Sequence, residues 1–537
     1  MARTRAGLIG LPKEYDNRWP RSRQKALRRL HKVASIGPNR SPGIGALEEV
    51  NVMLRLRAAV LLATIFVVGC SSSPTTSQTP ASVAPTTAAT ASSPASSPAS
   101  SVSADKGPIT FWTAEDNAAR VQATQAIVDK FTQSTGIQVK LVAIAEDQLV
   151  GQVTSAAAAG TLPDAFGAIS LGTTHTLAGA GILDPAAAGR VLDALGRDTF
   201  SPASITLVSE DNAPVAVPSD SWAQLLLYRK DLFQQAGLAV PDTFDAILAA
   251  ATKLQGNGRV GIVASTGPAD SFTQQTFEYF AVANGCQAVD QSANVTLTSP
   301  NCVDTFKFYT DLIKKGSHSG IQDADTTRAD YFSGKAAMMV WSSFILDELA
   351  GLRNDALPTC TECKADPTFL VKNTGIVTAI KGPDASSPAD FGELVSFGIT
   401  KGQPHEAAAE QFVQYMMSDG YADWLALAPE GKFPTRLGTK DDPQKFATAW
   451  GALKTGVDKK APLSDFYPAD TLTALTKSTD TMQRWGFSQG QGKIVGPLLS
   501  ELPIPKALAD ALDGSADPTA VAKAAQSAVE EIVKAIK

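Results

Sequence analysis

Histidine is scarce in this 537-residue chain, which has only His31, His175, His318 and His405. An α/β-hydrolase needs a nucleophile, an acid and a histidine in that chain order. The segment 486–490 matches the nucleophile-elbow pattern, but no histidine follows Ser488. The chain has no His-Glu-x-x-His pattern, and the segment 490–493 lacks the spacing of a nucleotide-binding loop. These absences argue against an α/β-hydrolase, a zincin-type protease and a Walker-type nucleotide-binding loop.

Basic residues are also few beyond the first 57 positions. Residues 58–537 carry 34 Lys and Arg against 49 Asp and Glu, a net charge of −15. Such a surface repels phosphate backbones. Nucleic acid is therefore not an expected partner.

Long apolar runs are missing as well. The segment 58–69 is uncharged, but a membrane span needs about 20 residues to cross ~30 Å of hydrocarbon. Two arginines precede it and Cys70 follows, an order typical of an export signal that ends at a lipidation site. Val67-Val68-Gly69-Cys70 resembles the lipobox of bacterial lipoproteins. The alternative is a buried helix with an incidental cysteine.

That resemblance implies a signal peptide over 53–69 and a mature protein that begins at an acylated Cys70, held by its lipid on the extracytoplasmic face of the bacterial cell membrane. Residues 1–52 are rich in arginine and are expected to be a start-site extension outside the mature protein. Residues 70–107 are nearly all Ser, Thr, Ala and Pro, without aromatics. This composition predicts a disordered tether.

Five cysteines leave an even number once Cys70 is set apart. In an exported chain, four cysteines indicate two disulfides with three possible connectivities. Sequence proximity favours Cys286 with Cys302 and Cys360 with Cys363. The Cys360–Cys363 pair could instead be a redox or zinc motif, although it stands in a proline-flanked loop rather than beside a βαβ unit.

The folded part is expected to begin near residue 108. Strand-like segments at 109–112, 137–143 and 165–169 alternate with helical segments near 121–131 and 149–159. This order predicts a parallel α/β sheet, whose ligands bind beyond the carboxyl ends of the strands. The 430 residues from 108 onward exceed the ~250–300 at which one core stops growing, so two lobes are expected.

Several separated blocks together resemble the family-1 extracellular solute-binding proteins of ABC importers, the class that includes maltose-binding protein. They follow the family's order and cover nearly all of 108–537. The blocks are Ile109–Trp112, Ala159–Asp164, Val217–Pro218, Leu227–Phe233, Ala236–Leu238, Pro241–Phe244, Tyr331–Met338, Ala407–Met417 and Gly431–Arg436.

The resemblance implies the two-lobed type II periplasmic-binding-protein fold with a hinge near Val217-Pro218. On that pattern the first lobe spans 108–217 plus 392–432, and the second spans 218–391 plus 433–537. The implied function is a non-enzymatic, monomeric, membrane-anchored receptor that needs no cofactor or metal and delivers a sugar or oligosaccharide to an ABC importer permease. The alternatives are a receptor for a phosphorylated or anionic solute and a secreted glycan-processing enzyme with a carboxylate pair such as Glu115 and Asp147.

A sugar site needs aromatic platforms and polar hydrogen-bond partners. The expected ligand-binding residues are Trp112, Glu115, Asp116, Asp147, Ser170, Trp222, Phe272, Gln274, Trp341, Phe344, Arg436 and Trp485. The tryptophans could equally be core residues. The acidic residues could cap helices or face solvent, and Arg436 could form an interlobe salt bridge. The position aligned with one stacking tryptophan of maltose-binding protein holds Ala168.

Overall fold

The computed structural model describes residues 105–536. The first part of the chain alternates strands and helices: β1 (Ile109–Thr113), α3 (Ala118–Thr135), β2 (Val139–Ala143), α4 (Glu146–Ala159), β3 (Ala165–Ser170), α5 (Leu171–Gly179), α6 (Pro185–Leu195), α7 (Pro202–Leu207), β4 (Ser209–Glu210) and β5 (Ala213–Pro214). The middle part contains β6 (Val217–Arg229), α8 (Lys230–Ala236), α9 (Phe244–Leu254), β7 (Val260–Val263), α10 (Ser271–Ala283), α11 (Pro300–Gly316), α12 (Ala324–Phe332), β8 (Ala336–Ser342), α13 (Ile345–Leu349), α14 (Phe369–Asn373) and β9 (Thr374–Val377).

The last part returns to the first before it ends in helices. Its elements are β10 (Gly392–Ile399), α15 (Glu406–Met416), α16 (Tyr421–Leu425), β11 (Phe433–Pro434), α17 (Lys445–Gly451), β12 (Lys454–Thr455), β13 (Ala461–Pro462), α18 (Ala469–Thr481), α19 (Val495–Glu501), α20 (Pro503–Asp513) and α21 (Pro518–Ala535).

The main sheet runs in the order β2-β1-β3-β10-β6-β8-β7, with β9 and β11 also paired to β6. The pairs β1–β2 and β1–β3 are parallel, as the alternating sequence pattern predicts. Strand β10 inserts antiparallel beside β3, which joins the segment from residue 392 to the first half of the sheet.

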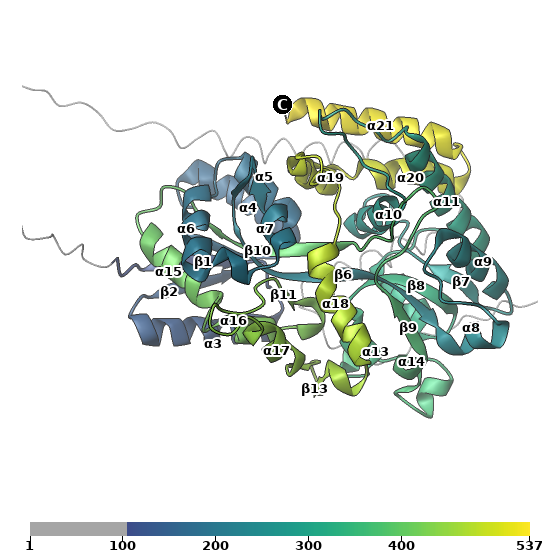
Figure 1. Cartoon of the computed structure of the whole chain (residues 1–537), viewed down its shortest axis with the longest axis horizontal. Helices are drawn as coiled ribbons and strands as arrows, with labels where there is room; N and C mark the ends of the chain where they lie inside the picture. The colour runs from purple at the N-terminus through teal and green to yellow at the C-terminus, as the bar shows by residue number, and fades with distance from the viewer. Residues whose placement is uncertain (1–104, 537) are drawn as a thin grey trace, which may run out of the picture. The chain divides into compact units, whose positions relative to one another are not determined.

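The thirteen-residue strand β6 belongs to both halves of the sheet. Val217–Ala223 pair with β10, whereas Gln224–Tyr228 pair with β8. Figure 1 shows β6 passing from the group of helices around β1 and β10 to the group around β7 and β8. The expected crossing at Val217-Pro218 therefore falls on the first two residues of this strand.

Local sequence signals explain how the first helix is placed. Asn117 caps α3 by accepting hydrogen bonds from the backbone N–H groups of Ala119 and Arg120. The helix ends at Gly136, whose φ of 78° is accessible mainly to glycine. Thr124, Ile127, Val128 and Phe131 are buried, so this face packs α3 against the sheet beside the end of β1.

The segment 433–501 contacts both halves of the molecule. Helix α18 packs against α7 and β6, and α19 packs against α5 as well as α10 and α21. The approach of α19 to α5 is close, because a Cβ added at Gly496 would lie 2.8 Å from the carbonyl oxygen of Gly172. The second lobe, expected to hold 433–537, thus meets the first lobe along this segment.

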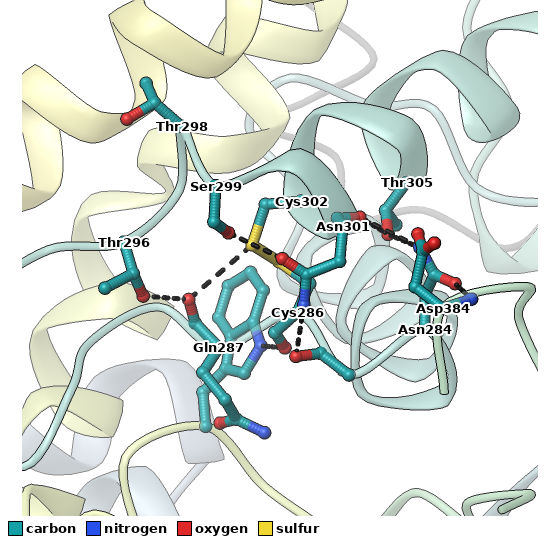
Figure 2. The surroundings of a disulfide bond; sticks show 12 residues. Asn284, Cys286, Gln287, Thr296, Thr298, Ser299, Asn301, Cys302, Thr305 and Asp384 are labelled. Atoms are coloured by element: carbon teal, nitrogen blue, oxygen red, sulfur yellow. Dashed lines mark hydrogen bonds between the residues drawn. A yellow bond between two sulfur atoms is a disulfide. The ribbon is translucent and has the colours of Figure 1, made fainter. Parts of the chain in front are cut away.

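The structure pairs Cys286 with Cys302 and Cys360 with Cys363, as sequence proximity favours. Figure 2 shows the first bond between the turn after α10 and the start of α11. Asn284 beside it donates to the Thr305 hydroxyl and to the Asp384 carboxylate. The disulfide and these hydrogen bonds fix the α10–α11 turn against the loop before β10.

The expected signal peptide, Cys70 and residues 70–104 of the tether lie outside the described residues. Residues 105–107, the end of the expected tether, are described, and Asp105 lies 2.9 Å from the His405 ring nitrogen Nδ1. Within residues 105–536, no helix is both long and apolar enough to cross a membrane.

Candidate functional site

The candidate site lies beyond the carboxyl ends of β1 and β3, where α/β sheets commonly bind ligands. Glu115 and Asp116 follow β1, and Ser170 ends β3, where its hydroxyl caps α5. Asp147 lies with Glu146 in the first turn of α4. The ends of β1, β3 and α4 therefore bring several acidic side chains to one edge of the first half of the sheet.

A buried ion cluster connects this edge to the crossing strand. The Lys432 Nζ lies 2.6 Å from the Glu115 Oε1 and 3.2 Å from the Asp220 Oδ1 on β6. The same ammonium sits 4.4 Å from the Trp424 ring centroid. Asp220 also accepts hydrogen bonds from the Ser219 hydroxyl and the Trp424 indole. The Asp220 carboxylate is thus surrounded by three donors, as a buried charge requires.

These charges shift one another's pKa values. Burial lowers the pKa of Lys432, but Asp220 and Glu115 outweigh it and raise that pKa overall. Burial likewise opposes ionisation of Glu115, yet Lys432 and Arg120 lower its pKa. Lys432 and Glu115 are therefore both charged at neutral pH, and Glu115 is not available as a general acid.

A second buried cluster surrounds Arg484. Its guanidinium contacts the Glu278 carboxylate on α10 and the Glu393 carboxylate on β10, each at 3.0 Å. Glu393 also accepts from the backbone N–H of Leu171 at the start of α5, and from the Gln275 amide. Through Glu393 this cluster joins the first half of the sheet to α10 in the second half.

Trp222 lies on β6 between these two clusters. Strand register places it opposite Glu393, and strand alternation places it on the same face as Asp220. Trp222 and Tyr228 are the two residues of β6 that are not fully buried. Among the described residues, the Trp222 indole has no hydrogen-bond partner. A half-exposed indole on the crossing strand, flanked by carboxylates, is a ready surface for a ligand.

Glu146 is a further carboxyl group at this edge, and its environment favours the neutral form. Although its outer part is exposed, desolvation of its carboxyl raises the pKa of Glu146, and Glu393 raises it further. Glu115 and Asp116 act in the same direction. The site therefore combines a partly exposed indole with several neighbouring carboxyl groups.

Three expected aromatic residues lie on the second half of the molecule. Phe272 and Trp341 meet edge to face with ring centroids 5.9 Å apart, and the Trp341 indole donates to the Ala324 carbonyl. Phe344, just beyond β8, lies under the Arg120 guanidinium at 5.5 Å. Since Arg120 also contacts Glu115 at 3.4 Å, this pair links the two halves.

Other expected residues are turned away from this edge. Arg436 is buried and donates to the Thr199 hydroxyl and to the carbonyls of Leu195 and Met417, so its charge serves the packing of the first half. Trp485 is fully buried and donates to the Cys286 carbonyl. We leave both out of the site.

Trp112 and Gln274 also differ from expectation. Trp112 packs edge to face on Phe166 and lines a depression along α4, not the edge that holds Glu115. Gln274 is fully buried in α10, and both polar atoms of its amide are without a hydrogen-bond partner in the described part of the chain. An unpartnered buried amide is costly, which leaves Gln274 a candidate for a ligand contact.

Sequence reasoning missed Lys432, Asp220, Glu393, Arg484 and Arg120. One signal was present, because the Gly431–Arg436 block contains two cations. Nothing in the sequence distinguishes Lys432 from Arg436 as the cation of the site. Within residues 105–536, no group of three or more His, Cys, Asp or Glu residues is arranged to hold a metal ion.

The fold and this edge define the chain as a two-lobed α/β binding protein. Maltose-bound MalE3 of T. maritima aligns with a TM-score of 0.59 and 19% identity over 79% of this chain and 99% of that chain. UgpB of Mycobacterium tuberculosis in complex with glycerophosphocholine aligns with a TM-score of 0.60 and 19% identity, over 80% of this chain and 99% of that chain. At this identity, the similarity shows the fold alone.

The family follows from the sequence. Residues 115–423 match the model of the bacterial extracellular solute-binding proteins, and the chain belongs to that family. The putative ABC transporter periplasmic-binding protein YcjN of Escherichia coli (strain K12) is 29% identical over 330 residues, 58% of this chain and 70% of that protein. A putative binding protein of Brucella abortus is 24% identical over 259 residues, and the chain spans 61% of its length. This chain is a solute-binding protein of an ABC transporter.

Proposed function

We propose that the protein captures a neutral sugar or oligosaccharide outside the cytoplasmic membrane and delivers it to the permease of an ABC importer. The observation that carries this proposal is Trp222, a half-exposed indole without a partner in the described residues, which lies on the strand that crosses between the lobes. Indole faces bind the apolar face of a sugar ring, and neighbouring carboxylates accept hydrogen bonds from its hydroxyls.

Several structural neighbours support a sugar. MalE3 is described with maltose, the GacH receptor of Streptomyces glaucescens with acarbose, and a protein of Arthrobacter globiformis as binding cyclic α-maltosyl-1,6-maltose. UgpB, described with glycerophosphocholine, supports the alternative of a phosphorylated solute.

The charges of the site favour the neutral solute. The cations at the edge each have carboxylate partners: Lys432 has two, Arg484 has two and Arg120 has Glu115. These carboxylates already compensate the charge of the cations, so an anionic ligand would gain less than it would from an unpaired cation, although the Arg484 Nη2 has no partner within residues 105–536. A glycan-processing enzyme could not use Glu115 as its general acid, since Lys432 and Arg120 lower the pKa of Glu115.

Ligand capture would involve both lobes. We propose Glu115, Asp116, Asp147 and Ser170 as contacts from the first lobe, and Phe272, Gln274, Trp341 and Phe344 as contacts from the second, with Trp222 between them. A ligand that touches both lobes favours the closed state by its differential affinity for that state. We further propose that the lipid on Cys70 and the tether after it keep this monomeric receptor near its permease.

Thermal unfolding of the 537-residue protein tests the proposal. A neutral sugar at 100 times its dissociation constant should stabilise the folded state by about 2.7 kcal/mol. Trp222→Ala should reduce this stabilisation, whereas Trp485→Ala should lower the melting temperature without ligand. Stabilisation by phosphate esters alone would replace the sugar with the anionic solute, and conversion of the sugar to product would overturn the receptor proposal.

A further inference from the structure

A second partly exposed indole, that of Trp112, lies away from the proposed ligand edge. Of the six tryptophans in residues 105–536, Trp341, Trp424, Trp450 and Trp485 donate their indole N–H to a protein oxygen. Trp112 and Trp222 have no such partner in that part of the chain. Buried indoles normally find one. The half-exposed Trp112 indole therefore has both a ring face and a donor to offer.

Trp112 lines a depression of 510 Å³ along helix α4. Its polar neighbours there are Gln148, Gln152, Ser155 and Thr161. The amides of Gln148 and Gln152 make no hydrogen bond to another described residue. No charged residue of the described part of the chain lines the depression, although the chain carries an excess of acidic groups. This volume lies within the about 300–1,000 Å³ typical of small-molecule sites.

Gly151 is the observation that separates this depression from an ordinary surface groove. It occupies the middle of α4 at an exposed position, where glycine is less favourable than alanine. A Cβ added there would meet nothing within 4 Å, and its backbone is not in the left-handed region. Neither packing nor conformation requires this glycine. Its absent side chain leaves the depression beside Trp112 open.

We propose that this depression is a second binding site, separate from the edge that holds Trp222, and that it takes a neutral carbohydrate. An indole face stacks on the CH face of a pyranose ring, while two amides and two hydroxyls supply donors and acceptors for its hydroxyl groups. The lack of charged residues gives no partner to an ionic ligand. This proposal does not depend on what Trp222 binds.

The indole N–H signals of the seven tryptophans test the proposal in the full chain. Each signal is assigned by substitution, and neutral oligosaccharides (maltoheptaose, cellohexaose and laminarihexaose) are titrated, with trigalacturonate as the charged control. At least one neutral oligosaccharide should shift the Trp112 signal saturably, and trigalacturonate should not. The Trp112 shift should survive Trp222→Ala.

Two further variants make the test decisive. Gly151→Arg places a long side chain in the depression and should weaken the titration at Trp112 about tenfold, the loss expected when stacking is blocked. Gly179→Arg is the matched control, because Gly179 is also an exposed helical glycine with nothing within 4 Å of an added Cβ. A Trp112 signal that moves with none of the three neutral sugars, or moves equally in Gly151→Arg, would overturn the proposal.

Discussion

The ion cluster around Lys432 is expected to hold the first lobe to the crossing strand, and Lys432→Met tests this directly. Methionine keeps a similar length and apolar stem but removes the ammonium that lies 2.6 Å from Glu115 and 3.2 Å from Asp220. Both carboxylates are almost completely buried. Removing one partner of a buried pair typically costs about 3–5 kcal/mol, because the remaining charge is left uncompensated.

Urea denaturation followed by far-ultraviolet circular dichroism gives the free energy of unfolding of both proteins. Lys523→Met is the control, because Lys523 is exposed on α21 and has no ion pair within residues 105–536. The control should change stability by less than about 0.5 kcal/mol. If Lys432→Met lowers the free energy of unfolding by less than about 1 kcal/mol, the buried cluster contributes no more than an exposed ion pair does. That result would refute the reasoning.

The pH dependence of the free energy of unfolding is a second test of the same cluster. The folded pKa of Glu115 is lowered, so its stabilisation is present above the ordinary carboxyl pKa and is lost as pH falls through the lowered value. The folded pKa of Lys432 is raised, so its stabilisation is lost only as pH rises through that value. The difference between wild type and Lys432→Met should be largest above the pH at which the uncompensated Glu115 carboxyl of the variant takes up a proton, and it should shrink as pH falls below that point or rises through the raised pKa of Lys432. A difference that stays constant down to pH 3 would contradict the assigned ion pairs.

Three further changes have distinct expected results. Trp222→Ala should weaken sugar binding about tenfold in isothermal titration calorimetry and change the melting temperature little, since the indole is half-exposed and stacking contributes about 0.5–1.5 kcal/mol. Replacing Cys286 and Cys302 together by serine should lower the free energy of unfolding by about 3 kcal/mol, because the disulfide closes a loop of 16 residues. Gly151→Ala should raise it by about 1 kcal/mol, and no gain in thermal unfolding would mean that α4 needs a glycine there.

Local signals in the sequence are sufficient to predict the first strands and helices of the fold. Asn117 and Gly136 mark the two ends of α3, and the strand pattern at 165–169 matches β3. The two-lobed α/β architecture is confirmed by the structural neighbours. These features are predictable because caps, glycine stops and strand alternation act over a few residues.

The partners of the charged residues could not be predicted in the same way. Lys432 and Arg436 are four residues apart, and both are nearly buried. Lys432 reaches Glu115, more than 300 positions earlier in the chain, whereas Arg436 turns to backbone carbonyls near α6 and α15. Strand β11 lies between these two residues. Its pairing with β6 decides which of the two cations meets a carboxylate.

The six tryptophans of the described residues show which physical property separates a core indole from a ligand-facing one. Position in the sequence made Trp485 and Trp222 equal candidates, but Trp485 is fully buried with its N–H bonded to a carbonyl, whereas Trp222 is half-exposed with its N–H unpartnered. Burial without a partner would cost free energy, so an indole that keeps its donor free must keep access to water or to a ligand. By this criterion Trp222 and Trp112 keep a free donor for a ligand, whereas Trp341 is proposed only as a ring contact because its N–H is bonded to the Ala324 carbonyl. The separate locations of Trp222 and Trp112 are the reason to expect two carbohydrate sites rather than one.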